Sequence, residues 1–137
     1  MDRRFKACVA WGAIWDYHAT WKGRFDAEGR AAQGVPTEYI HWVLNTKSQE
    51  EALGKLQNFR LDGVVQQMRC PFLLTHGEGD RQVPLRDAKA LYRAVGSKDK
   101  SLKVYTRQTG GAQHCQNDYL SIGLPYMQDW IREKLGA

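Results

Sequence analysis

Two loops in the second half of the chain carry side chains that could perform acid–base chemistry. The first loop, residues 76–84 (HGEGDRQVP), contains Asp80, and the second, residues 109–115 (TGGAQHC), contains His114. A carboxylate that binds one ring nitrogen of a histidine fixes its tautomer, and it stabilises the imidazolium that forms when the other nitrogen accepts a proton. We therefore predict that Asp80 and His114 form an acid–base pair, in which His114 takes a proton from a nucleophile.

The other histidines and the nearby cysteine are less suited to this chemistry. Cys115 follows His114 directly, but adjacent residues rarely aim their side chains at each other. We expect Cys115 to enter the last helix and not to act as a nucleophilic thiol. His76 is predicted to be a structural turn residue, and His18 and His41 are predicted to lie in a helical cap or on the surface.

Three aromatic residues, Trp11, Trp15 and Tyr17, follow the carboxyl end of the first predicted strand. Ligand clefts are commonly lined by such side chains, so they could form part of a substrate-binding wall. Packing inside the cap is an equally good interpretation, and both stay open at this point.

Regular elements separate and flank the two loops. Residues 5–11, 71–77 and 102–105 are short apolar runs typical of strands, and the first two are predicted to be buried. The spacing of apolar residues predicts helices over 85–95 and 119–135. Because sites form at the carboxyl ends of parallel strands, the Asp80 and His114 loops are predicted to meet at one edge of a parallel sheet.

The segment between the first two strands does not resemble sheet-forming sequence. Residues 14–34 are rich in aromatic and basic residues and show no clean period. A helix is predicted to begin after Pro36 with Thr37 as its cap, and a second one at Ser48, where Ser-Gln-Glu-Glu forms a capping box. Two short helices in this place indicate a small inserted cap.

The two loops and their order resemble the α/β-hydrolase family. The pattern strand-Gly-x-x-Asp-x-x-Val-Pro, with Asp80 at the acid position, resembles the acid loop, and residues 111–116 resemble the histidine loop. Within the family, the chain resembles the branch that contains 2,6-dihydroxypseudooxynicotine hydrolase and the fungal hydrolases that shorten polyketide chains.

The resemblance implies a partial α/β-hydrolase fold of about three parallel strands with flanking helices and a small helical cap insertion. The chain would be one truncated domain: a strand in residues 1–13, cap and linker in 14–68, and the acid loop, histidine loop and C-terminal helix in 69–137. It would correspond to the C-terminal portion of the family fold.

The family's nucleophile elbow, G-x-S-x-G on a strand-to-helix turn, is absent from the 137 residues. The resemblance implies hydrolysis of an ester, an amide or a carbon–carbon bond next to a carbonyl, without a cofactor. Asp80 would orient His114, and the serine nucleophile would come from sequence outside this chain. We therefore expect the chain by itself to be inactive.

Composition argues against a nucleic-acid-binding module, a membrane-spanning protein and a cysteine metal site. The formal net charge of +5 comes from 20 Lys and Arg interleaved with 15 Asp and Glu, without the basic stripe of a nucleic-acid-binding module. The sequence has no apolar run long enough to span a membrane. Three scattered cysteines show no metal-binding spacing, and their odd number favours a reducing, cytoplasmic location.

Two other interpretations remain. The chain could be a non-enzymatic interaction module that pairs through the edge of its first strand, either with a second copy or with a separate N-terminal fragment. We expect a homodimer or a larger assembly on this interpretation. A complete flavodoxin-like protein is the third possibility, although the N-terminal phosphate-binding loop of that fold is missing.

Overall fold

The computed structural model describes residues 4–26 and 35–136, which form two compact units. Unit 1 contains the strands and the C-terminal helices and is built from residues up to Trp15 and from Leu61 onwards. Unit 2, Asp16–Arg60, contains three helices. Residues 61–68, which the sequence analysis placed in the cap and linker, belong to unit 1.

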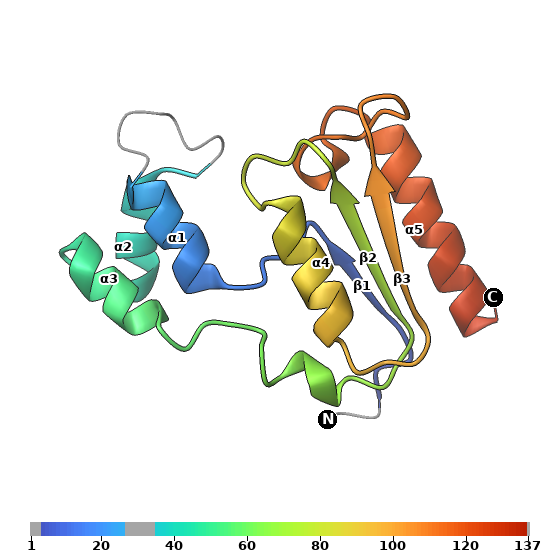
Figure 1. The fold of residues 1–137 in the computed structure, drawn as a ribbon, viewed down its shortest axis with the longest axis horizontal. Coiled ribbons are helices and arrows are strands. Elements are labelled where there is room, and N and C mark those ends of the chain that lie inside the picture. Colours follow the sequence, from blue (N-terminus) through green and yellow to red (C-terminus); the bar gives the residue numbers. More distant parts are fainter. Residues whose placement is uncertain (1–3, 27–34, 137) are drawn as a thin grey trace. The chain divides into compact units, whose positions relative to one another are not determined.

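Unit 1 is organised around a parallel sheet of three strands in the order β1-β2-β3 (Figure 1). The strands are β1 (Cys8–Trp11), β2 (Phe72–Gly77) and β3 (Lys100–Tyr105). Trp11 pairs with Thr75, and Gly77 pairs with Tyr105. All three strands end at the same edge of the sheet, as the sequence predicts.

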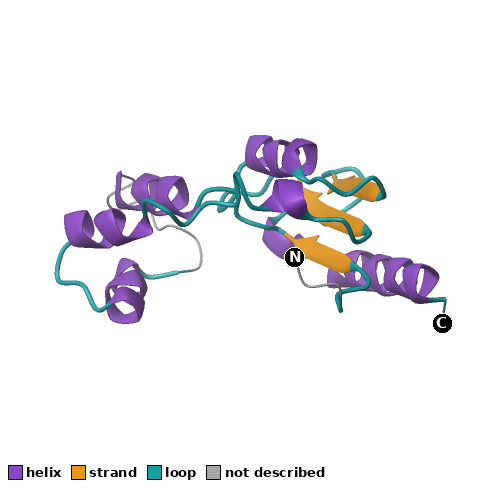
Figure 2. Ribbon diagram, turned by 90° about the horizontal axis from the view of Figure 1, so that it is seen from below, coloured by secondary structure: helices purple, strands orange, loops and turns teal. Residues whose placement is uncertain are grey.

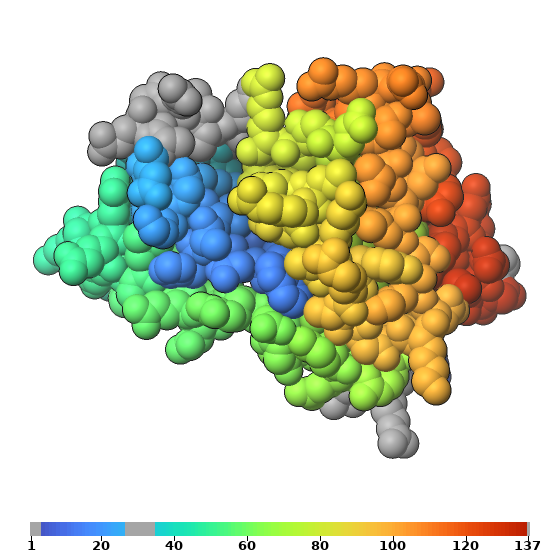
Figure 3. Space-filling model, viewed as in Figure 1, coloured from blue at the N-terminus to red at the C-terminus, as the bar shows by residue number. Residues whose placement is uncertain are grey.

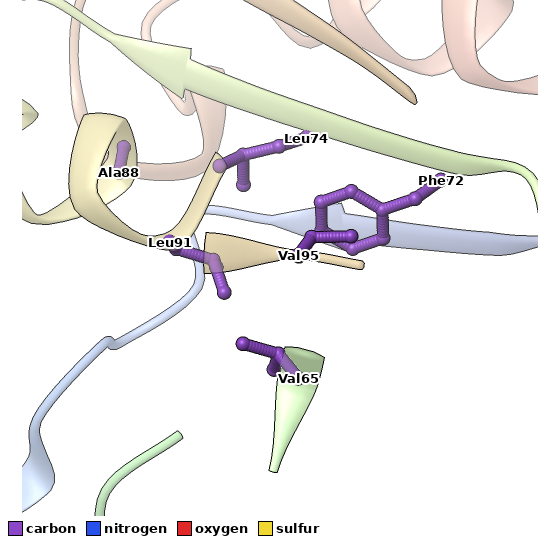
Figure 4. Packing of buried hydrophobic residues seen from close by; sticks show 6 residues of the cluster. All are labelled: Val65, Phe72, Leu74, Ala88, Leu91 and Val95. Atoms are coloured by element: carbon purple, nitrogen blue, oxygen red, sulfur yellow. The ribbon is translucent and has the colours of Figure 1, made fainter. Parts of the chain in front are cut away.

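Helices lie on both faces of this sheet, as Figure 2 shows. On one face, the side chains of Phe72 and Leu74 pack against α4 (Leu85–Ala94) and the short 3₁₀ helix η1 (Val65–Gln67). Figure 4 shows six residues of this cluster: Val65, Phe72, Leu74, Ala88, Leu91 and Val95. In the space-filling view, α4 and the residues around β3 form the surface of unit 1 on this side (Figure 3).

The opposite face packs against the long helix α5 (Leu120–Leu135). Leu73 lies between Phe72 and Leu74 in β2, so its side chain points to the other side of the sheet, where it contacts Met127 and Trp130. Every residue of β2 is buried, which is the expected environment of a central strand with helices on both faces.

Unit 2 has its own apolar core. It consists of α1 (Tyr17–Asp26), α2 (Thr37–Leu44) and α3 (Gln49–Leu56). Each helix contributes at least one buried side chain to a shared apolar cluster. The members of this cluster are Trp21, Phe25, Ile40, Ala52 and Leu56. Within residues 4–26 and 35–136, no helix is long and apolar enough to cross a membrane.

Several local predictions are wrong. The first strand is shorter than residues 5–11 and only half-buried, because it lies at the edge of the described sheet. Thr37 does not cap α2, since Pro36 precedes the helix without a capping side chain. Ser48 does cap α3, by accepting the Glu51 N–H at 3.1 Å.

Within its described residues, the cap has three helices where the sequence predicts two. The additional helix, α1, lies in the segment without a clean period, and Asp16 caps it by accepting the Ala19 N–H at 2.8 Å. The apolar side chains of α2 are largely exposed. Ile40 is buried, but Trp42 is 80% exposed.

A candidate acid–base site at the carboxyl ends of the strands

The acid loop follows Gly77, the last residue of β2, and holds Asp80 through backbone hydrogen bonds. The Asp80 Oδ1 atom accepts the backbone N–H of Gln82 at 2.8 Å and that of Val83 at 2.9 Å. The Asp80 side chain is fully buried, so these donors replace the water that an ionised carboxylate would otherwise bind. The second carboxylate oxygen, Oδ2, is therefore left to bind a side chain from outside the acid loop.

The histidine loop brings His114 to that second oxygen. His114 Nδ1 donates to Asp80 Oδ2 at 2.7 Å, and the histidine side chain is 26% exposed. This is the pair predicted from the sequence. Asp118 supports the loop from the other side, since its carboxylate accepts the N–H groups of Ala112 and Gln113 at 3.1 and 3.0 Å.

Glycines allow the loops to approach each other this closely. A Cβ atom on Gly77 would collide with the carbonyl oxygen of Ala112. Gly79 lies next to the same oxygen and donates its N–H to it at 2.9 Å. Gly12, at the end of β1 with a φ of +63°, leaves room for His114, since a Cβ atom there would lie 3.2 Å from His114 Cε1.

The pair is electrostatically coupled. Burial raises the pKa of Asp80, but the hydrogen bond from His114 and the Val83 and Gln82 N–H groups outweigh it, so the net shift is downward. The hydrogen bond to Asp80, followed by the contact with Cys115, raises the pKa of His114 to about 10. At neutral pH the described pair is therefore a carboxylate and an imidazolium.

His76 is not a turn residue, contrary to the prediction. It lies in β2, fully buried, and its Nε2 atom donates to the Val83 carbonyl at 2.9 Å and lies 3.6 Å from Asp80 Oδ2. His76 thus links β2 to the end of the acid loop at Val83. Its position directly before Gly77 is the only signal that the sequence offers for this role.

Cys115 does not enter the last helix. It lies in the 3₁₀ helix η2 (His114–Gln116) with a φ of +50°, and its thiol donates to the Trp11 carbonyl at 3.5 Å. Gln116, with a φ of +49°, is also in the left-handed region and is fully buried. Its Oε1 atom accepts the Trp11 indole N–H at 2.7 Å, a contact that sequence reasoning missed because the residues are 105 positions apart.

The three predicted aromatic residues lie in different surroundings. Trp11 contacts the histidine loop through Gln116 and Cys115. Trp15 packs against the buried cluster that contains Ala88 and Leu91 of α4. Tyr17 belongs to unit 2, where its ring meets that of Trp21 edge-on at 6.2 Å between centroids.

The four serines all lie in described segments, and none is in a strand-to-helix elbow. Ser48 caps α3, and Ser97 donates to the Asp99 carbonyl in the connection from α4 to β3. Ser101 lies within β3 and Ser121 within α5. Among residues 4–26 and 35–136, no group of three or more His, Cys, Asp or Glu side chains could hold a metal ion.

The comparisons with known proteins bear on the fold that carries these loops. Residues 51–109, which include the acid loop, match the family model described as serine aminopeptidase, S33. The crystal structure of 2,6-dihydroxy-pseudo-oxynicotine hydrolase is similar to the chain with a TM-score of 0.73 and 25% sequence identity, over 98% of this chain. The chain has a partial α/β-hydrolase fold.

The partial α/β-hydrolase fold accounts for the place of the site, because both loops follow the carboxyl ends of parallel strands. The chain spans 34% of the length of the hydrolase it matches. The comparison with curated protein sequences gives no match.

Proposed function

We propose that Asp80 and His114 are the acid and the general base of a serine α/β-hydrolase. The observation that carries the proposal is the 2.7 Å hydrogen bond from His114 Nδ1 to the buried Asp80 carboxylate. It leaves Nε2 as the ring nitrogen that accepts the proton of a serine hydroxyl. The substrate would be a small molecule with an ester, an amide or a carbon–carbon bond next to a carbonyl.

The nucleophile, on this proposal, comes from a segment that these 137 residues do not contain. Two observations support it: no serine occupies an elbow, and the chain spans 34% of the length of the hydrolase it matches. Removing a triad member typically lowers the rate by about 10⁴- to 10⁶-fold. The chain by itself would therefore have no efficient hydrolase activity.

The charge of the pair supports the same conclusion. A general base must be unprotonated, whereas a pKa of about 10 keeps His114 charged at neutral pH. Further protein packed over the partly exposed imidazole would desolvate it, which lowers the pKa of a histidine. Completion of the site would thus both supply the nucleophile and release the base.

The first experiment is to sequence the DNA immediately upstream of the Met1 codon. An in-frame segment that encodes G-x-S-x-G would support the hydrolase, and a stop codon close upstream would count against it. The extended protein should then hydrolyse an activated ester such as p-nitrophenyl acetate. His114→Ala should lower kcat by about 10⁴- to 10⁶-fold, and Asp80→Asn by about 10⁴-fold.

Asp62→Asn is the matched control, because it removes one carboxylate charge from an exposed loop whose partners are Gly63 and Gln66. It should leave kcat unchanged. Ester hydrolysis by the 137-residue chain well above the buffer rate, if abolished by His114→Ala, would contradict the proposal of an external nucleophile.

Aromatic side chains would form part of the substrate-binding wall in the complete enzyme. Trp11 is placed best for this role, because it contacts both residues that follow His114. Trp15 and Tyr17 are proposed on sequence position alone. Trp15→Ala or Tyr17→Ala should raise KM more than it lowers kcat.

A second candidate function is that of an interaction module, favoured by the edge position of β1. Among the described residues no strand pairs with the outer side of β1, whose residues are all half-buried. An open strand edge can pair with another chain. On this proposal the chain forms a homodimer or binds a separate N-terminal fragment, and a clean monomer by sedimentation at micromolar concentration would contradict it.

The proposed compartment is the cytoplasm. Cys8, Cys70 and Cys115 are all free thiols, and free cysteines in odd number are typical of reducing compartments. Fractionation of source cells, followed by detection of the chain in the cytosolic fraction, tests this assignment.

A further inference from the structure

We infer that Trp11 and Gln116 form a positioning pair, which holds the histidine loop on the carboxyl end of β1 and thereby sets the position of His114. The inference rests on the proposed role of His114, but it concerns how the chain places that residue. Neither Trp11 nor Gln116 is itself a partner in the hydrogen bond between His114 and Asp80.

The hydrogen bond of the pair is short, and its acceptor side is buried. Trp11 Nε1 donates to Gln116 Oε1 at 2.7 Å, and the Gln116 side chain is fully buried. An indole N–H can only donate, so the bond fixes which end of the amide faces Trp11. A second hydrogen bond joins β1 to the histidine loop, since the Cys115 thiol donates to the Trp11 carbonyl at 3.5 Å.

The slot around Gln116 fits this side chain closely. A Cβ atom on Gly111 would lie 3.0 Å from Gln116 Cγ, and one on Gly123 would lie 3.2 Å from Oε1. The loop and the start of α5 therefore close around the amide from two sides. Tyr119 adds a backbone contact, because its N–H donates to the Gln116 carbonyl at 2.9 Å.

The choice of glutamine is costly if packing is its only role. Gln116 Nε2 is buried without a hydrogen-bond partner among the described residues, and an orphaned buried donor destabilises a fold. Methionine has a similar length and would fill the slot without that cost. The acceptor Oε1 is thus the feature that distinguishes glutamine here.

The backbone next to His114 needs such a restraint. Cys115 and Gln116 both have φ near +50°, a region that residues other than glycine rarely adopt. Strained residues of this kind persist where surrounding contacts over-determine them. Without the Trp11 bond, the two residues can relax, and the imidazole that precedes them moves away from Asp80.

The test measures the histidine and does not depend on hydrolase activity. Gln116→Met removes the acceptor, Trp11→Phe removes the donor, and the double variant removes both. The His114 ring is titrated by NMR in the 137-residue chain, and the Trp11 indole N–H signal, identified by its loss in Trp11→Phe, is followed in Gln116→Met.

We expect each single variant to lower the pKa of His114 from about 10 by at least about one unit, a tenfold change in its protonation equilibrium. The double variant should lower it no further than either single variant, as for one shared interaction. In Gln116→Met the Trp11 indole signal should move upfield.

Leu73→Val is the control, because it trims the cluster against which Trp11 packs but keeps the hydrogen bond between Trp11 and Gln116; it should leave the pKa unchanged. An unchanged His114 pKa in folded Trp11→Phe would overturn the inference, even if Gln116→Met does not fold. A lowered pKa together with an inactive extended protein would uphold the pair and contradict only the proposed function.

Discussion

At the scale of single residues, the site depends on how Asp80 and His114 share charge. Asp80 keeps its carboxylate ionised although it is buried, because His114 and two backbone N–H groups bind it. His114 in turn keeps its proton well above the pH at which a free histidine loses it. Their mutual hydrogen bond contributes to both shifts, so removing either partner should reduce the shift of the other.

The first prediction concerns the proton on His114. In Asp80→Asn the negative charge is gone, so the pKa of His114 should fall from about 10 towards 6.5. An NMR titration of the imidazole from pH 5 to 11 measures the change. Asp62→Asn is the charge-matched control and should leave His114 unaffected; equal titration curves for Asp80→Asn and the unaltered chain would refute the coupling.

The second prediction concerns stability and pH. Because the folded pKa of His114 is raised, its contribution to stability is complete below about pH 6.5 and is lost as pH rises through about 10. The folded pKa of Asp80 is lowered from 3.8, so its contribution is present above that pH and is lost on further acidification. Both contributions are complete only between these limits.

Urea unfolding of the unaltered chain and of His114→Gln at a series of pH values measures this dependence. The stability advantage of the unaltered chain should be greatest near pH 5 to 6, shrink from neutral pH towards pH 10, and also shrink below pH 4. A constant difference across the whole range would mean that the pair contributes packing and no charge interaction.

At the scale of elements, the strands and loops of unit 1 could be predicted because local signals agree there. The apolar run that forms β2 is followed at once by turn residues, and α4 keeps helical spacing after Pro84. The meeting of Asp80 and His114 follows from parallel strands alone. The strand and the helix depend on neighbours in sequence, and the parallel order of the strands then brings the two loops to one edge.

Other features could not be predicted, because they depend on distant residues. The helix α1 has only Trp21 and Phe25 as fully inward side chains, so it lacks a long apolar period. Its burial comes from Ile40 and Leu56 on other helices. Gln116 is likewise explained only by Trp11, on a strand at the other end of the chain.

The third prediction tests whether the loops need their close approach. Gly77→Ala would push a methyl group into the Ala112 carbonyl, backbone that cannot move aside without shifting the histidine loop. We expect a loss of stability of about 1–3 kcal/mol, the usual cost of overpacking. Thermal and urea unfolding both measure it.

Gly54→Ala is the matched control for this prediction. Gly54 lies in α3, where a Cβ atom would meet nothing within 4 Å. Alanine favours a helix over glycine by about 0.8–1 kcal/mol, so this variant should be more stable than the unaltered chain. Equal effects of the two substitutions would show that the contact between Gly77 and Ala112 does not restrict the site.

At the scale of the whole molecule, the outer edge of β1 is an edge of the described sheet that another strand could join. The N–H groups of Cys8 and Gly12 donate to Pro71 and Thr75 on the β2 side. Since alternate residues of a strand point their N–H groups to opposite sides, the Val9 N–H faces the outer edge. A proline at that position would remove an outward donor and keep the bonds to β2.

The fourth prediction uses this alternation to test self-association. If copies of the chain pair through the β1 edge, Val9→Pro should convert an assembly into a monomer, as judged by sedimentation velocity at micromolar concentration. Val9→Ala is the matched control, because it removes the same contacts with the cluster around Leu73 but keeps the N–H; it should remain assembled. An assembly that survives Val9→Pro would place the contact elsewhere on the chain, whereas one that both variants abolish would depend on the apolar face of β1 and not on its hydrogen-bonding edge.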